Sequence, residues 1–179
     1  PVGVLIKNDQ TIFSGQVTTN VLGTHLGKEI EIADLDGDSH DDLIFSFHGW
    51  NAVLICWGGP DRMTFGSELT YMKESTEVSR FGYAVEVGDI DGNGQMDMII
   101  SSPLHSDESR SLFQCGALNV YYDIGRIRGN TSISSNTYLR PRIWGMNSYD
   151  KLGASVILKD TNGDGKDDIS NRLFIGKSL

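Results

Sequence analysis

Residues 81–103 read FGYAVEVGDIDGNGQMDMIISSP, and this stretch decides the fold. Val85 and Val87 alternate with small or polar neighbours at a period of two, which is typical of a β-strand. Oxygen-bearing residues then recur from Asp89 to Asp97, and a second apolar run follows directly. The pattern predicts a strand, an acidic turn and a returning strand.

The same pattern occurs in two other places. Residues 26–34 and 152–160 match residues 81–89 without a gap, because each stretch starts with a large apolar residue and Gly and ends in Asp. The three Asp residues are 55 and 71 positions apart. These spacings fit a repeat of about four short strands with their turns.

Other apolar runs support an all-β chain. No stretch keeps apolar residues at a spacing of 3.6 through three helical turns, so no amphipathic helix is expected. Runs with the β-branched and aromatic residues typical of strands are Val2–Lys7, Ile12–Val17, Leu43–Phe45, Ala52–Trp57, Met98–Ile100, Ala117–Tyr122 and Leu173–Gly176, with Ile169 before the last. We therefore expect the end of one unit in 1–20, full units in 21–75 and 76–145, and the start of another in 146–179.

The acidic turns have the ligand pattern of a hard cation. Positions 1, 3, 5 and 9 carry side-chain oxygens in all three turns, position 4 is Gly, and position 7 can offer its backbone carbonyl. Ca²⁺ takes 6–8 oxygen ligands, whereas Mg²⁺ keeps its waters. An EF-hand would need Glu at position 12, which is Phe45, Ile100 or Asn171 here. The predicted ligands of three structural Ca²⁺ sites are Asp34, Asp36, Asp38, His40 and Asp42; Asp89, Asp91, Asn93, Gln95 and Asp97; Asp160, Asn162, Asp164, Lys166 and Asp168.

Charge is concentrated in these turns. They hold 12 of the 24 acidic residues and one basic residue, in a chain whose formal net charge is −9. Carboxylates crowded in this way repel each other unless a cation neutralises them. The alternative is that the turns are solvated acidic loops. The acidic balance also disfavours nucleic acid as a partner, and no apolar run is long enough to span a membrane as a helix.

The combination of lead Gly, acidic turn and later β-strand resembles the FG-GAP repeat, which builds the β-propeller of integrin α-subunits and the C-terminal domain of glycosylphosphatidylinositol-specific phospholipase D. The best match runs from Phe81 to Pro103 and continues at Gly116–Tyr122. The first and third repeats depart from it by starting with Leu. The resemblance implies four-stranded antiparallel blades, of which this chain supplies about three. Since propellers have about 4–8 blades, the remaining ones would come from the parent chain or another chain.

The resemblance also implies a function. We expect a calcium-binding, non-catalytic recognition or adhesion module for a protein or glycan, in a secreted or cell-surface setting. The expected ligand loops are Leu104–Gln114, Thr76–Arg80 and Asn147–Lys151, and the favoured alternative for the first is a flexible surface insertion. The alternative is an accessory propeller of a phospholipase D-like enzyme, and a third hypothesis is a purely structural domain. No catalytic constellation stands out, so enzyme activity would need a separate catalytic domain in the parent protein.

Two further features leave alternatives open. Cys56 lies in an apolar run and is interpreted as a buried small hydrophobe, but a disulfide with Cys115 is possible. Asn130 begins an Asn-Thr-Ser glycosylation acceptor, which is usable only in the secretory pathway.

Overall fold

The computed structural model describes residues 4–7, 10–14, 25–60, 68–74, 78–129, 132–134 and 141–171. Strands dominate these residues, and no α-helix occurs among them. The helical elements of this part are short 3₁₀ turns: η1 (His48–Trp50), η2 (Glu108–Arg110) and η3 (Ile124–Ile127). The expected all-β fold class is confirmed.

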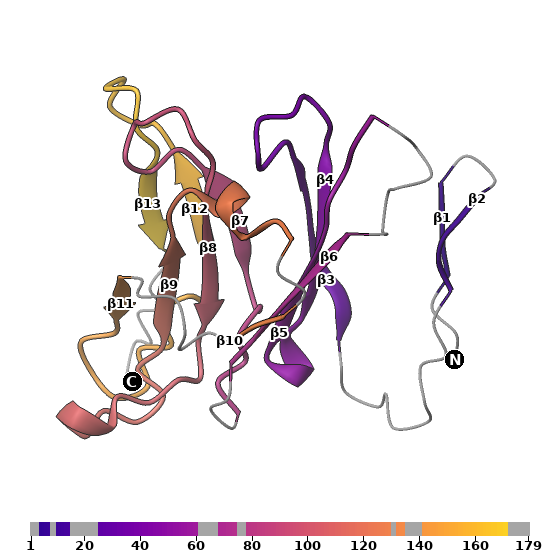
Figure 1. The fold of residues 1–179 in the computed structure, drawn as a ribbon. Helices are drawn as coiled ribbons and strands as arrows, with labels where there is room; N and C mark the ends of the chain where they lie inside the picture. Colours follow the sequence, from indigo (N-terminus) through magenta and orange to yellow (C-terminus); the bar gives the residue numbers. More distant parts are fainter. Residues whose placement is uncertain are drawn as a thin grey trace.

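Two large sheets stand side by side (Figure 1). The first has the order β10-β6-β5-β4-β3, and the second has the order β11-β9-β8-β7. Strands that are consecutive in each sheet pair antiparallel, apart from β10, which pairs parallel with β6. Their bounds are β3 (Leu26–Ala33), β4 (Asp42–Phe47), β5 (Ala52–Cys56), β6 (Leu69–Lys73), β7 (Val85–Gly88), β8 (Asp97–Ser102), β9 (Ala117–Tyr121), β10 (Ser132–Ser134) and β11 (Arg142–Trp144).

Each large sheet therefore contains the four-stranded antiparallel meander that the repeat predicts. The parallel strand β10 was not expected. It comes from the chain between β9 and β11 and pairs with the outer strand of the neighbouring sheet, so part of the second repeat covers an edge of the first. Covered edges have fewer unpaired backbone groups, which lowers the risk of edge-to-edge association.

Two hairpins flank the large sheets. β12 (Val156–Lys159) pairs with β13 (Asp168–Asn171), and β1 (Val4–Lys7) pairs with β2 (Gln10–Ser14). β7 lies between β3 and β12, so the first strands of three repeats are neighbours in space. The rest of the predicted N-terminal strands and the predicted strand Leu173–Gly176 lie outside the described residues.

Apolar side chains fill the spaces between successive sheets. Because side chains alternate across a strand, each sheet has two faces to cover. One face of each large sheet contributes to a shared core that includes Ile44, Ile55, Met72, Val85, Met98 and Ile100. The other face of the second sheet packs on β12 and β13 through Ile99, Leu118, Val120 and Val156. The second sheet is thus covered on both faces.

The lead Gly of the second and third repeats allows successive sheets to come close. Gly82 has φ +86°, and a Cβ at this position would lie 2.7 Å from the Ala52 carbonyl oxygen at the start of β5. Gly153 has φ +93°, and a Cβ there would lie 2.6 Å from the Ser101 Cβ. Both positions need a residue without a side chain, since L-residues rarely adopt this φ and the neighbouring strand leaves no room.

The cysteines are both buried and form no disulfide. Cys56 packs in β5 as the small hydrophobe expected from its apolar run, and burial raises the pKa of its thiol to about 11. Cys115 precedes β9. Asn130 lies outside the described residues. None of the helices in the described part of the chain is long and apolar enough to cross a membrane.

Candidate metal centres

The three acidic turns join the first two strands of their repeats. We call them loop 1 (34–42), between β3 and β4; loop 2 (89–97), between β7 and β8; and loop 3 (160–168), between β12 and β13. All three lie at the same end of the sheets, shown at the top of Figure 1, and η1 and η2 lie at the other end.

The Asp at position 1 organises each loop through backbone hydrogen bonds. In loop 1, Asp34 accepts hydrogen bonds from the amides of Gly37, Asp38 and Ser39 at 2.8–3.1 Å. Asp89 accepts equivalent bonds in loop 2. In loop 3 the same role falls to Asp160, which accepts bonds from Gly163 at 2.7 Å and Gly165 at 3.0 Å. The loops therefore wrap around this carboxylate, as the spacing predicts.

Positions 3 and 5 continue this wrapping in every loop. The side-chain oxygen at position 3 accepts from the amide of position 5, and the oxygen at position 5 accepts from the amide of position 7. The bonds at position 3 involve Asp36, Asp91 and Asn162, at 2.8–3.2 Å. Those at position 5 involve Asp38, Asn93 and Asp164, at 2.7–3.0 Å, with His40, Gln95 and Lys166 as donors. Every predicted position is thus drawn into a compact turn.

The Asp at position 9 ties the loop to the rest of the sheet. Asp42 accepts hydrogen bonds from the amides of Leu35 at 2.8 Å and Gly58 at 2.6 Å. Asp97 accepts them from Ile90 and Asp123, both at 2.9 Å. Gly58 and Asp123 follow the third strand of their sheets, so this carboxylate links three strands.

Burial gives these two carboxylates an unusual electrostatic state. Both Asp42 and Asp97 are inaccessible to solvent. Burial raises the pKa of Asp42 and Asp97, although their backbone hydrogen bonds oppose the change. The nearby charges of Asp36 and Asp91 raise the two pKa values further. A divalent cation bound beside these two carboxylates would favour their ionised form and so lower their pKa values again.

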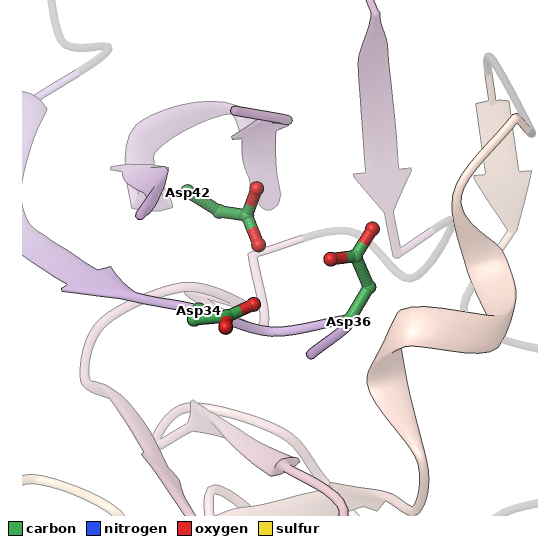
Figure 2. Close-up of side chains that lie close together, drawn as sticks. All are labelled: Asp34, Asp36 and Asp42. Carbon is green, nitrogen blue, oxygen red and sulfur yellow. The ribbon is translucent and has the colours of Figure 1, made fainter. Parts of the chain in front are cut away.

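Loops 1 and 2 bring three carboxyl groups together. In loop 1 Asp34, Asp36 and Asp42 each place one carboxylate oxygen within 4.8 Å of the other two, and Figure 2 shows the three groups facing a common space. Asp89, Asp91 and Asp97 form the same cluster in loop 2. Oxygen-only clusters of this size fit a hard divalent ion such as Ca²⁺. These two groups could therefore hold a metal ion.

Loop 3 repeats the turn but not the cluster of three acids. Its position 3 is the amide Asn162, and Asp168 accepts hydrogen bonds from the amide and hydroxyl of Thr161. Among the described residues, only loops 1 and 2 gather three carboxylates. Backbone hydrogen bonds from Gly165 and Gly163 lower the pKa of Asp160.

Loop 1 also contacts a cation that the sequence analysis missed. Asp38 is not part of the three-carboxylate cluster of loop 1, and its Oδ2 accepts a hydrogen bond from the guanidinium of Arg128 at 2.9 Å. The same Nη1 donates to Asp36. The two partners are 90 and 92 residues away in the sequence, so no local pattern could have revealed Arg128.

The comparisons with known proteins confirm the resemblance to FG-GAP proteins. Residues 34–100, which contain loops 1 and 2 and the strands between them, match the family model described as an FG-GAP-like repeat. This part of the chain is thus similar to an FG-GAP-like repeat, and the antiparallel sheets are consistent with propeller blades of that type.

Two kinds of curated relative are similar to the chain. Phosphatidylinositol-glycan-specific phospholipase D of Rattus norvegicus is 29% identical over 170 residues, which cover 87% of this chain and 19% of the relative. Integrin alpha-IIb of Mus musculus is 26% identical over 147 residues, which cover 80% of this chain and 14% of the relative. The chain thus spans less than a fifth of the length of either protein.

Proposed function

We propose that this chain is a calcium-binding segment of a β-propeller that serves as a non-catalytic recognition or adhesion module for a protein or glycan. The observation that carries this proposal is the convergence of three carboxylates in each of two successive loops. Like charges this close are unfavourable in a folded protein unless a cation balances them. The proposal includes a third site in loop 3, where Asp160, Asp164 and Asp168 would act with Asn162.

The arrangement of the sheets supports a division into blades. The strands β3–β6 fall within the proposed unit 21–75, and β12 and β13 fall within 146–179. The strands β7–β11 fall within 76–145, although β10 pairs with the first sheet. The hairpin β1–β2 would close a preceding blade in 1–20. Ile30 and Ile32 of β3 are 48% and 63% exposed, whereas the equivalent Val85 of β7 is 2% exposed. A preceding blade would cover this face as the first sheet covers the second.

The end opposite the metal loops has features of a recognition surface. Phe113, Met146 and Tyr149 are large apolar residues with 63%, 82% and 66% exposure. The amide of Tyr149 donates to the Phe113 carbonyl at 2.7 Å, so two of the expected ligand loops are joined. Exposed aromatic residues on rigid loops are typical anchors in protein interfaces. Part of the third expected loop, Thr76–Arg80, lies outside the described residues.

The surroundings we propose are extracellular or at the cell surface. Weak calcium sites of extracellular modules have dissociation constants of about 10⁻⁴–10⁻³ M, and such sites fill only where calcium is abundant. The three loops are short and most of their residues are exposed or half-buried, which would suit that range.

A second candidate function is an accessory propeller in an enzyme that resembles phosphatidylinositol-glycan-specific phospholipase D. The similarity to relatives of that name in rat, mouse and cattle favours it. In that case catalysis would need a separate domain of the parent protein. The complete parent sequence discriminates between the two: a catalytic domain supports the enzyme, and adhesion-type stalk domains with a membrane anchor support the recognition module.

Calorimetric titration with Ca²⁺ tests the proposed calcium binding. Asp89→Ala should remove binding at loop 2 and leave loops 1 and 3 intact, because the Asp89 carboxylate accepts hydrogen bonds from loop 2, whereas its contact with Asp167 of loop 3 uses backbone atoms that Ala keeps. Glu108→Ala is the matched control, since it removes one exposed acidic side chain in η2 at the opposite end. A wild-type protein that takes up no Ca²⁺, or equal losses in both variants, would contradict the proposal.

A further inference from the structure

Loops 1 and 2 have the same carboxylate cluster but different neighbours. The guanidinium of Arg128 contacts loop 1 through Asp36 and Asp38, and its Nε donates to Glu68 at 2.8 Å. Among the described residues, no basic side chain forms an ion pair with Asp89, Asp91 or Asp97 of loop 2. One of two otherwise equivalent loops thus has a cation of its own.

Arg128 is held firmly in this position. Its Nη2 donates to the Gly58 carbonyl at 2.7 Å, and its guanidinium lies 5.8 Å from the centre of the Trp57 ring. The side chain is only 26% exposed. A planar guanidinium with several fixed partners loses little further conformational freedom when it binds carboxylates. The contact of Arg128 with the loop 1 carboxylates is therefore better ordered than an ion pair between exposed side chains.

The backbone before Arg128 also lies close to loop 1. η3 approaches the loop so closely that a Cβ on Gly125 would lie 2.7 Å from the Asp36 Cα. Two residues earlier, the same segment contacts loop 2, where the amide of Asp123 donates to Asp97 and the Asn93 side chain donates to Asp123. The segment 123–128 therefore brings a cation to loop 1 and an additional acid to loop 2.

We propose that Arg128 is a built-in counter-cation of loop 1 that makes this loop a weaker calcium site than loop 2. The inference rests on the proposed calcium binding. In loop 1 the guanidinium already neutralises part of the charge of Asp36 and Asp38, and it repels a divalent ion bound by the same carboxylates. The Lys166 side chain of loop 3 lies against Gly92 of loop 2, but among the described residues it forms no ion pair with the loop 2 carboxylates. Loop 2 should therefore fill before loop 1 as the Ca²⁺ concentration rises.

Two matched variants test this role by calorimetric Ca²⁺ titration. Arg128→Met removes the charge but keeps an apolar stem against Trp57. It should tighten the loop 1 site about tenfold, the effect of one unit charge on a divalent ion a few ångströms away. Arg126→Met removes the same charge from a side chain that is 78% exposed and pairs with Asp123, and it should leave loop 1 unchanged. Adding Asp34→Ala to Arg128→Met should abolish the tightened site.

A measurement on the wild-type protein avoids the risk that Arg128→Met folds poorly. The Nε–H signal of Arg128 in a ¹⁵N-edited NMR spectrum should stay still during the tightest calcium step and move with a later one. A signal that moves with the tightest step, or unchanged affinity in a folded Arg128→Met protein, would overturn the inference while leaving calcium binding intact. If neither protein binds Ca²⁺, the proposed function fails and this inference fails with it.

Discussion

The two ends of the sheets differ in how their carboxylates are neutralised. At the loop end, carboxylates crowd together, and loop 2 has no ion pair among the described residues. At the opposite end, Glu74 is fully buried but receives hydrogen bonds from Arg142 at 2.8 Å and Ser102 at 3.0 Å, and His105 lies 3.3 Å away. Charge balance at this end comes from the protein itself.

The difference indicates where an external ion is needed. Arg142 also donates to Asn119 at 2.7 Å, so the buried cluster joins the outer strand of the second sheet to the end of β6 without help from a ligand. The loop end has no comparable set of opposite charges in loop 2. We therefore expect that an ion stabilises the loop end and that the opposite end needs none.

The largest effect should come from Arg142→Met. This change leaves Glu74 buried without its main cationic partner, and breaking a buried ion pair costs about 3–5 kcal/mol. The free energy of unfolding in urea should fall by about this amount, equally with Ca²⁺ and with chelator. Arg126→Met, an exposed control, should change it by less than about 1 kcal/mol. A loss that disappears when Ca²⁺ is added would show that the two ends are not independent.

A smaller effect is expected from pH in the metal-free protein. Burial opposes ionisation of Glu74, but the hydrogen bonds of His105 and Ser79 and the charge of Arg142 hold its pKa below the usual 4.5. A lowered folded-state pKa contributes stability that is present above pH 4.5 and lost as the pH falls through the folded pKa. The raised pKa values of Asp42 and Asp97 act oppositely, since their contribution is present below pH 3.8 and lost as the pH rises.

Urea unfolding in chelator from about pH 7 to about pH 3 measures these contributions. The wild type should lose the Glu74 contribution at the acid end of this range. Glu74→Gln cannot titrate there, so its stability should decline less on acidification, while starting from a lower value. An identical acid-dependent loss in both proteins would assign the pH dependence to other groups.

The smallest effect on stability is expected from Asp91→Asn, and its sign should differ between the metal-free and the calcium-bound protein. Loop 3 already has Asn at this position, so the loop geometry tolerates it. Without metal, the loss of a like charge near Asp97 should raise the stability by about 0.5 kcal/mol, or about 1–2 °C in melting temperature. With Ca²⁺ the variant should melt below the wild type. Glu108→Gln should change neither value, and a destabilised metal-free variant would contradict the crowding argument.

The sequence was sufficient for the parts of the fold that depend on local patterns. Alternation at Val85 and Val87 predicts their strand, and the Asp spacing from Asp89 to Asp97 predicts a turn that wraps around the first carboxylate. The lead Gly82 could be recognised from the sequence as a recurring position of the repeat. Why this position must be Gly could be learned only from the structure, because the nearby Ala52 carbonyl belongs to another sheet.

Contacts between distant segments could not be predicted. Arg128 lies 90 residues from Asp38 in the sequence, and Arg142 lies 68 residues from Glu74. Neither residue stands in a motif. β10 was missed for the same reason, since three residues with weak strand character pair only because the fold brings them to the edge of β6. The acidic clusters were foreseen, whereas the groups that balance them were not.

Equilibrium dialysis against about 10 mM Ca²⁺, above the dissociation constants of weak extracellular sites, tests the central claim most directly. The account predicts three bound ions per wild-type chain, one for each loop, and one fewer after Asp89→Ala. A folded wild-type chain that retains no Ca²⁺ under these conditions would contradict it.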